Sequence, residues 1–324
     1  MSLSEFDLIH RYFTDLTPAR ADVRLGVGDD CALLAPPGDQ LLAVSIDTLV
    51  EGRHFSPGAD PFSLGHKCLA VNLSDLAAMG AEPAWVTLAL TLPRPDEAWL
   101  AAFSRGFGTL ANRHGVQLVG GDTTRGPLSM TLQVHGFVPE AQALRRRGAR
   151  PGDLVYVSGT LGDAGLALLA RQGLYVQAGT LGYLNERLDR PTPRLTVGRA
   201  LRGLAAAAID VSDGLGADLG HVCVASGVAA TLYLDRLPLS PAVGAYVAET
   251  GDWRMPLSAG DDYELCFTVP AARQGEAEAL GSQLDVPLTW IGTVEKGQGV
   301  RAVLPDGGGL TEVPAGYDHF GGHV

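Results

Sequence analysis

The stretch from Leu41 to Phe55, LLAVSIDTLVEGRHF, contains the pattern on which the fold prediction depends. Residues 41–46 form a short apolar run that predicts a buried strand. Asp47 follows this run directly, and a polar segment with a glycine turn comes next. We therefore expect a sheet that places an acidic side chain at the end of a strand, where α/β folds bind their ligands.

Strands and helices alternate on both sides of this stretch. Helices are predicted over 62–79 and 96–114, and further helices begin near residues 4, 163, 193, 214 and 271; strands are predicted over 84–92, 116–119, 128–138, 154–157, 207–211, 229–234, 264–269 and 288–291. This alternation is typical of α/β or α+β domains.

One segment interrupts the alternation. Between Glu140 and Asp153 the periodicity is lost, four arginines gather, and the segment ends in a Pro-Gly turn. For a chain of 324 residues, two domains are a reasonable expectation. We place their predicted limits at 1–148 and 149–324.

The composition restricts the function. The formal net charge is −12, from 36 acidic and 24 basic residues, and this excludes a protein that wraps nucleic acid, whose surface would be basic. Twenty-four of the acids are aspartates, which are typical of turns, caps and oxygen-rich metal sites rather than of exposed helices. With 42 glycines and 46% hydrophobic residues, the chain resembles a compact enzyme with many tight turns.

The placement of the aspartates is the most informative feature. They recur after predicted strands and in glycine turns, at Asp29, Asp30, Asp47, Asp122, Asp210, Asp213, Asp261 and Asp262, and Asp75 joins them from a predicted helix with Asn72 three residues before it. Clustered carboxylates repel one another unless a hard cation joins them, and Mg²⁺ takes oxygen ligands while leaving room for phosphates. Asp163 and Asp218 are interpreted instead as turn residues or helix caps.

Other residues leave alternatives open. Gly120 and Gly121 either let backbone amides approach a phosphate or form a strand-ending turn. His54 either contacts a substrate phosphate or caps a turn. Taken alone, the arginines at 145, 146, 147 and 150 favour a solvated linker over a polyphosphate clamp, and Lys67 favours a surface lysine over a phosphate ligand.

The familiar signatures of other enzyme classes are missing from the sequence. It has no P-loop, no protein-kinase motif set, no nucleophile elbow and no pair of histidines at zinc-ligand spacing. Four scattered cysteines and an N-terminus without a signal pattern predict a soluble, cytoplasmic protein. The residues alone thus predict a Mg²⁺-dependent, two-domain enzyme that acts on phosphates.

Six motifs resemble the thiamine-monophosphate kinase family. They are GVGDDCALL (26–34), SIDTLVEGRHF (45–55), KCLAVNLSDLAAMGAEP (67–83), GGDTTRGPLSMTLQVHGFVP (120–139), AIDVSDGL (208–215) and GYDHF (316–320). The resemblance runs from Phe6 to Phe320 and extends to the superfamily of aminoimidazole ribonucleotide synthetase. It implies two α/β (α+β) domains, a homodimer formed through the N-terminal domain, and ATP bound near the dimer interface.

The resemblance also implies roles for individual residues. Mg²⁺ ligands would be Asp30, Ser45, Ile46 through its backbone, Asp47, Asp75, Asp122, Asp210 and Asp213, with Asp47, Asp122 and Asp210 central to catalysis; ATP would contact Gly121, Asp122, Arg146 and Ser212; and thiamine monophosphate would contact His54, Asp261 and the position of Pro314. Asp261 stands where the family usually has Glu. Pro314 stands where it commonly has a stacking aromatic, for which Tyr317 or Trp253 could substitute.

The implied reaction is ATP-dependent phosphorylation of thiamine monophosphate to thiamine diphosphate. Transfer between two phosphates needs alignment and charge neutralisation more than a nucleophilic side chain, so direct in-line transfer is expected. The alternatives are another activity of the superfamily, such as a ribonucleotide synthetase or a selenophosphate synthetase, and a nucleotide-binding maturation protein without catalysis.

Overall fold

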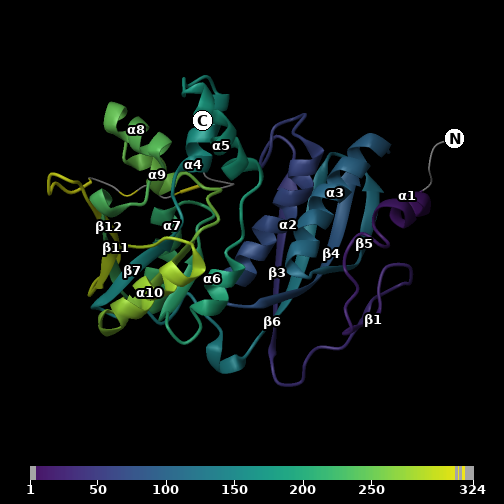
Figure 1. Ribbon diagram of the computed structural model, residues 1–324, viewed down its shortest axis with the longest axis horizontal. Helices are drawn as coiled ribbons and strands as arrows, with labels where there is room; N and C mark the ends of the chain where they lie inside the picture. Colours follow the sequence, from purple (N-terminus) through teal and green to yellow (C-terminus); the bar gives the residue numbers. More distant parts are fainter. Residues whose placement is uncertain (1–4, 311–312, 314–315, 318–324) are drawn as a thin grey trace. The chain divides into compact units, whose positions relative to one another are not determined.

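The computed structural model describes residues 5–310, 313 and 316–317. The chain divides into two compact units (Figure 1): the first comprises Met1–Leu76 with Ala81–Ala141, and the second comprises Ala77–Gly80 with Gln142–Val324. Both units combine helices with a mixed, mainly antiparallel sheet, and the predicted α/β (α+β) class is confirmed. No helix among the described residues is long and apolar enough to cross a membrane.

The first unit is built on a four-stranded sheet with the strand order β3-β6-β4-β5. Its elements are α1 (Glu5–Tyr12), β1 (Val23–Leu25), β2 (Leu33–Leu34), β3 (Leu41–Val50), α2 (Pro61–Ala78), β4 (Glu82–Leu92), α3 (Glu97–His114), β5 (Gln117–Arg125), β6 (Ser129–Val138) and the 3₁₀ turn η1 (Glu140–Gln142). Strand β6 pairs antiparallel with both β3 and β4, while β4 and β5 are parallel. Strands β3 and β5 are therefore the two edges of this sheet.

Helices α2 and α3 lie side by side in the first unit (Figure 1). Their backbones approach closely at two glycines: a Cβ on Gly65 would lie 2.0 Å from the Phe103 carbonyl oxygen, and one on Gly106 would lie 1.9 Å from that of Phe62. Asp96 caps α3 by accepting from the Trp99 amide at 3.1 Å. These contacts fix α2, the helix that presents Asn72 and Asp75.

Strand β3 is longer and less buried than its sequence predicts. It runs through Asp47 to Val50, because every residue from Leu41 to Val50 pairs with β6. The prediction of a buried strand is wrong for one of its faces, since Leu42, Val44 and Ile46 remain 46%, 49% and 58% exposed. Apolar residues on alternate positions of an edge strand thus form an open apolar face.

The second unit contains a six-stranded sheet with the order β12-β9-β11-β7-β10-β8. Its elements are β7 (Asp153–Ser158), α4 (Asp163–Arg171), α5 (Ala178–Asp189), α6 (Leu195–Ala200), β8 (Ala207–Asp210), α7 (Leu215–Ser226), β9 (Ala229–Tyr233), η2 (Leu234–Arg236), α8 (Pro241–Thr250), α9 (Arg254–Ser258), β10 (Leu265–Pro270), η3 (Ala271–Arg273), α10 (Gln274–Leu284), β11 (Leu288–Glu295) and β12 (Gly299–Val303). Only β9 and β12 are parallel neighbours.

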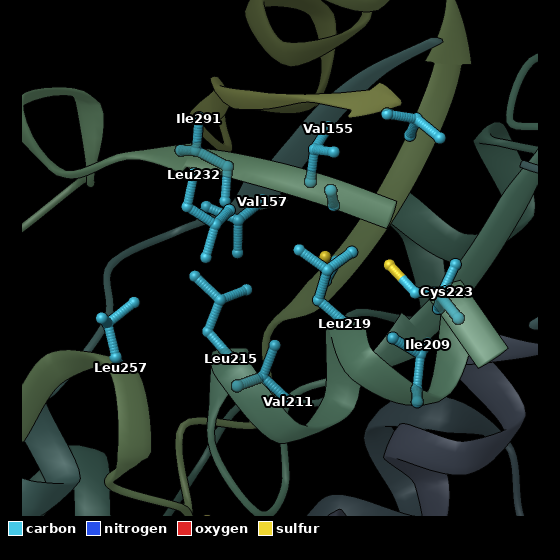
Figure 2. Close-up of a cluster of buried hydrophobic side chains, with 14 of the residues drawn as sticks. Val155, Val157, Ile209, Val211, Leu215, Leu219, Cys223, Leu232, Leu257 and Ile291 are labelled. Atoms are coloured by element: carbon cyan, nitrogen blue, oxygen red, sulfur yellow. The ribbon is translucent and has the colours of Figure 1, made fainter. Parts of the chain in front are cut away.

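A hydrophobic core joins helix α7 to this sheet. Figure 2 shows Leu215 and Leu219 of α7 beneath Val155 and Val157 of β7, with Ile291 of β11 beyond them, and all five are buried. The core anchors the start of α7 directly against the strands. The loop that links β8 to α7 is consequently held at both of its ends.

Candidate active site

Two hydrogen bonds join strand β3 to helix α2 in the first unit. The Ser45 hydroxyl donates to Asp75 Oδ2 at 2.5 Å, and the Asp47 amide donates to Asn72 Oδ1 at 3.1 Å. The Asn72 amide group donates in turn to the Cys68 carbonyl at 2.9 Å, which fixes its orientation. Ser45 and Asp47 share one face of β3, because side chains two residues apart on a strand point the same way.

Asp47 and Asp122 do not terminate their strands, contrary to the prediction. Asp47 pairs with Leu132 inside β3, and Asp122 pairs with Ala89 inside β5. Both strands continue because the neighbouring strand supplies backbone hydrogen-bond partners for the residues that follow the aspartate. Gly121, likewise predicted to lie in a turn or to approach a phosphate, sits against β4, where a Cβ would lie 1.9 Å from the Leu88 carbonyl oxygen.

The sheet places these two aspartates far apart within one chain. The register aligns Asp47 with Leu132, then Leu88, then Gly121, so Asp47 and Asp122 occupy opposite edges of the sheet. Three strand spacings separate the edges, about 14 Å along the sheet. Asp122 and its neighbour Ala89 are exposed, whereas the Asp47 partner Leu132 is buried. A single chain therefore does not bring these two carboxylates together.

Asp30 and His54 lie in the loops around β3. Asp30 is exposed between β1 and β2, and its amide donates to Asp29 Oδ1 at 2.8 Å. His54 caps the turn after β3, since its Nδ1 accepts from the Val50 amide at 2.9 Å. The neutral ring then carries its proton on Nε2.

Lys67 is not the surface lysine that its sequence context predicts. It lies on α2 with only 4% of its surface exposed. A charged group at that depth requires polar partners, so Lys67 belongs to the interior of the first unit. Its position inside the resemblance motif KCLAVNLSD was the one signal that set it apart from an ordinary surface lysine.

In the second unit, the end of β8 and the loop after it carry Asp210, Ser212 and Asp213. Asp210 ends β8 as predicted and is 5% exposed. The amides of Ser212, Asp213 and Gly214 donate to Asp218 Oδ2 at 3.0, 3.1 and 3.1 Å. Asp218 does not cap α7, whose N-cap is Gly214; it lies in the first turn of the helix and accepts instead from the loop that precedes it. Burial, followed by the charge of Asp213, raises the pKa of the Asp218 carboxyl to about 7 against the opposing effect of these amides.

The loop before β10 is joined to this loop by backbone hydrogen bonds. The Tyr263 amide donates to the Val211 carbonyl at 2.8 Å, and the Asp261 amide donates to the Ser212 carbonyl at 2.9 Å. These bonds continue the β8–β10 pairing beyond the strand ends. Asp261 and Tyr263 both have positive φ, 68° and 49°, and the Tyr263 hydroxyl donates to Asp261 Oδ1 at 2.9 Å. The loop therefore holds the Asp261 carboxylate in a defined direction.

A buried ionic cluster supports the same loop, and sequence reasoning missed it. Glu264 is fully buried, and its carboxylate accepts from Ser158 at 2.6 Å, from two nitrogens of Arg194 at 2.6 Å each and from Arg187 at 2.8 Å. Gly159 leaves room for this carboxylate, because a Cβ there would lie 2.2 Å from Glu264 Oε1. An acidic residue at the head of the apolar run ELCFTV was the signal available in the sequence.

Asp163 and Asp262 complete the ionic cluster. Asp163 is predicted to be a turn residue or a helix cap, and in the structure it accepts from the hydroxyls of Thr160 and Tyr183 at 2.5 and 2.8 Å. Burial raises the pKa of the Asp262 carboxyl well above its ordinary value, against the opposing effects of the Gly162 amide, which donates to it at 2.8 Å, and of Arg187. Burial is thus the main cause of this upward shift in the pKa of Asp262.

The remaining predicted site residues are Arg146 and Pro314, together with the two aromatics considered in place of Pro314. Arg146 is exposed, and its carbonyl accepts from Ser226 at the end of α7 at 3.2 Å. Pro314 lies outside the described residues. Of the two aromatics considered in its place, Tyr317 donates its amide to the Asp213 carbonyl at 3.1 Å, whereas Trp253 packs against the hydrophobic core.

The structure leaves the metal set as a prediction. Ser45, Asp47 and Asp75 gather in the first unit, and Asp210 and Asp213 lie near one another in the chain of the second. Among residues 5–310, 313 and 316–317, no three His, Cys, Asp or Glu side chains form a group that could hold a metal ion.

Family models match both halves of the chain. Residues 28–138 match "AIR synthase related protein, N-terminal domain", and residues 150–305 match "AIR synthase related protein, C-terminal domain". The two-domain aminoimidazole ribonucleotide synthetase-like fold that the resemblance implies is therefore confirmed.

Similar curated proteins cover the whole length. The thiamine-monophosphate kinases of Salmonella typhimurium and Escherichia coli K12 are 52% and 53% identical over 322 residues, which is 99% of this chain and 99% of each relative.

Solved structures agree with these relatives. The crystal structure of thiamine-monophosphate kinase from Stenotrophomonas maltophilia is 49% identical, with a TM-score of 0.86 over 96% of this chain and 99% of that one. A complex described as "AaThiL complexed with AMPPCP and TMP" is 32% identical, with a TM-score of 0.76 over 88% and 89% of the two chains.

Proposed function

The chain belongs to the thiamine-monophosphate kinase family, and on this basis we propose that it transfers the terminal phosphoryl group of ATP to thiamine monophosphate. The products are thiamine diphosphate and ADP, so the chain is a phosphotransferase. The observation that carries the proposal is identity of about half over the full length with curated members of the family. The solved relative in complex with AMPPCP and TMP supports the choice of both substrates.

The nucleotide is assigned to four residues. Gly121 and Asp122 of β5, Ser212 of the loop after β8, and Arg146 would contact ATP. Two features of Arg146 support this role. The residue is exposed, and its backbone carbonyl accepts a hydrogen bond from Ser226 of α7. An arginine placed this way can make charge-assisted, bidentate hydrogen bonds to phosphate oxygens.

Mg²⁺ is assigned to eight oxygen-donor residues. The proposed ligands are Asp30, Ser45, the backbone of Ile46, Asp47, Asp75, Asp122, Asp210 and Asp213. The donor chemistry fits the ion, because Ser45, Asp47 and Asp75 gather oxygens only, the ligand type that Mg²⁺ prefers. These residues would hold the ion, which would supply positive charge to offset that of the phosphates.

Thiamine monophosphate is assigned to His54, Asp261 and the position of Pro314, which lies outside the described residues. Because His54 Nδ1 accepts from the Val50 amide, the Nε2 hydrogen is the one directed to the substrate phosphate. The Asp261 carboxylate, oriented by Tyr263, suits the cationic ring of thiamine. Tyr317 lies beside the Asp213 loop and supplies an aromatic surface in place of Pro314.

Direct transfer follows from the chemistry of the acceptor. The attacking atom is a phosphate oxygen of thiamine monophosphate, which is already ionised near neutral pH, so the chain needs no strong general base. Its residues hold the donor and the acceptor in line and direct hydrogen-bond donors at the transferred group. Asp47, Asp122 and Asp210 are the side chains on which catalysis most depends.

We further propose that the chain is a homodimer formed through its first unit. The open apolar face of β3, with Leu42, Val44 and Ile46, supports a self-complementary contact. Because Asp47 and Asp122 occupy opposite edges of one sheet, a dimer also allows ligands from two copies to serve one site. Val44→Glu should therefore yield a monomer in sedimentation equilibrium; an unchanged dimer would exclude this face.

A cytoplasmic location is also proposed. Cys31, Cys68, Cys223 and Cys266 are all free, and the last three are buried. Free thiols are typical of a reducing compartment, where disulfides do not persist.

The test of the proposed activity compares acceptors. The protein is incubated with ATP and Mg²⁺ and one of three acceptors: thiamine monophosphate, a ribonucleotide amide or selenide. We expect thiamine diphosphate from the first and no turnover of the other two. Turnover of either alternative acceptor alone would assign a different superfamily activity, and ATP binding without turnover would identify a non-catalytic nucleotide-binding protein.

A further inference from the structure

Three successive amides in the loop after β8 converge on one oxygen atom. The N–H groups of Ser212, Asp213 and Gly214 all donate to Asp218 Oδ2, at 3.0, 3.1 and 3.1 Å. Consecutive amides directed at one point form an anion-binding concavity of the kind that elsewhere holds phosphate. In this chain the anion is a side chain of the protein itself, from the fourth residue of α7.

Burial and close packing hold Asp218 and the loop in this arrangement. Asp218 is 2% exposed, and its own amide donates to the Gly214 carbonyl at 3.0 Å in the first turn of α7. Gly214 has φ 117°, and a Cβ there would lie 2.8 Å from the backbone of Ser258, so no other residue fits without displacement. A buried carboxylate near the start of α7 is also favoured by the helix dipole.

The filled concavity limits how the loop can bind a nucleotide. Since Asp218 already occupies the three amides, a phosphate cannot use them. The Ser212 hydroxyl and the Asp213 carboxylate are then the groups left to face ATP and its magnesium. Asp218 is bonded to the backbone of both residues, so it fixes the direction in which these side chains leave the loop.

We propose that Asp218 is a positioning residue for the nucleotide: by occupying the amides of Ser212, Asp213 and Gly214, it directs the Ser212 hydroxyl and the Asp213 carboxylate toward ATP and Mg²⁺. The inference rests on the proposed function. Asp218 touches neither substrate in this account, and it acts only through the loop.

The test separates binding of the two substrates in Asp218→Asn. The asparagine keeps an acceptor oxygen for the loop but cannot carry the negative charge that strengthens the three hydrogen bonds when Asp218 is ionised. We expect the KM for ATP and the Mg²⁺ concentration for half-maximal rate to rise about ten-fold or more. The KM for thiamine monophosphate should stay within about two-fold of the wild-type value.

Asp153→Asn is the matched control. Asp153 is a buried aspartate of the same unit, and it accepts a backbone amide, that of Arg150, at 2.8 Å. We expect this variant to change thermal stability without changing the ratio of the two KM values. A purely structural role for Asp218 would make its variant behave like this control.

A second variant tests the occupied concavity itself. Asp218→Ala frees the three amides, and added formate should refill them and restore ATP affinity, whereas neutral formamide should not. An unchanged KM for ATP in Asp218→Asn, a parallel rise of both KM values, or equal rescue by formamide would overturn the proposal. If wild-type protein makes no thiamine diphosphate, the proposed function fails instead, and the two failures are distinguishable.

Discussion

Glu264→Ala would remove the carboxylate at the centre of the buried ionic cluster in the second unit. The wild-type carboxylate is fully buried and accepts from Ser158, Arg187 and both facing nitrogens of Arg194, at distances from 2.6 to 2.8 Å. The alanine would leave two guanidiniums largely buried without their main counter-charge. Breaking a buried ion pair from one side costs about 3–5 kcal/mol of unfolding free energy.

That loss is large enough to measure directly. For a unit of this size it corresponds to a fall of roughly 6–20 °C in the unfolding midpoint. Thermal unfolding followed by near-ultraviolet circular dichroism, supported by urea titration, would detect it. Glu264→Gln should lose less, because its amide keeps an acceptor for Ser158 while removing the charge.

The matched control is Glu276→Ala. Glu276 also pairs with an arginine, Arg273 at 2.7 Å, but on the surface, where solvent screens the pair. We expect no measurable shift from this variant. A midpoint for Glu264→Ala within about 2 °C of the wild type would show that the cluster does not hold the loop, and would refute the reasoning.

Three further predictions concern pH, substrate binding and catalysis. Because burial raises the pKa of Asp262, its protonated form stabilises the folded state at low pH, and this contribution is lost as pH rises through that pKa. The thermal midpoint of Asp262→Asn should therefore rise relative to that of the wild type as pH increases. A difference in midpoint that does not change with pH would contradict a raised pKa for Asp262. His54→Ala should raise the KM for thiamine monophosphate and leave that for ATP nearly unchanged; the reverse pattern in steady-state kinetics would reject its role. Asp47→Asn should lower kcat by about two orders of magnitude or more. The control Asp39→Asn, in an exposed turn, should leave kcat unchanged. A near wild-type kcat in Asp47→Asn would remove Asp47 from the metal set.

The sequence predicted most elements of the fold but not where its strands end. The run at 41–46 marks β3 correctly, yet the strand continues to Val50 because β6 pairs along its whole length. An aspartate inside a strand and one at its end look alike in sequence, since the difference lies in the partner strand. The same limit applies to Asp122, which was expected in a turn and lies within β5.

The sequence likewise predicts some parts of the candidate site and not others. The loop that follows Asp210 and carries Asp213 could be predicted, because a strand, a glycine turn and a helix lie within a few residues of one another. The contacts of Glu264 could not be predicted, because Arg187 and Arg194 precede it by 77 and 70 residues. No local sequence pattern indicates that these residues meet. Helix α5, which carries Arg187, was also missed, since its sequence AGTLGYLNERLD contains two glycines and few apolar residues.

We propose that the phosphoryl group passes from ATP directly to thiamine monophosphate. A rapid-quench single turnover with ATP labelled at its terminal phosphate, Mg²⁺ and excess thiamine monophosphate tests this directly. With direct transfer, we expect the label to appear in thiamine diphosphate at the rate at which it leaves ATP, with no protein-bound label at any time. Label on the protein that forms and decays fast enough to lie on the path, or no label in thiamine diphosphate, would contradict it.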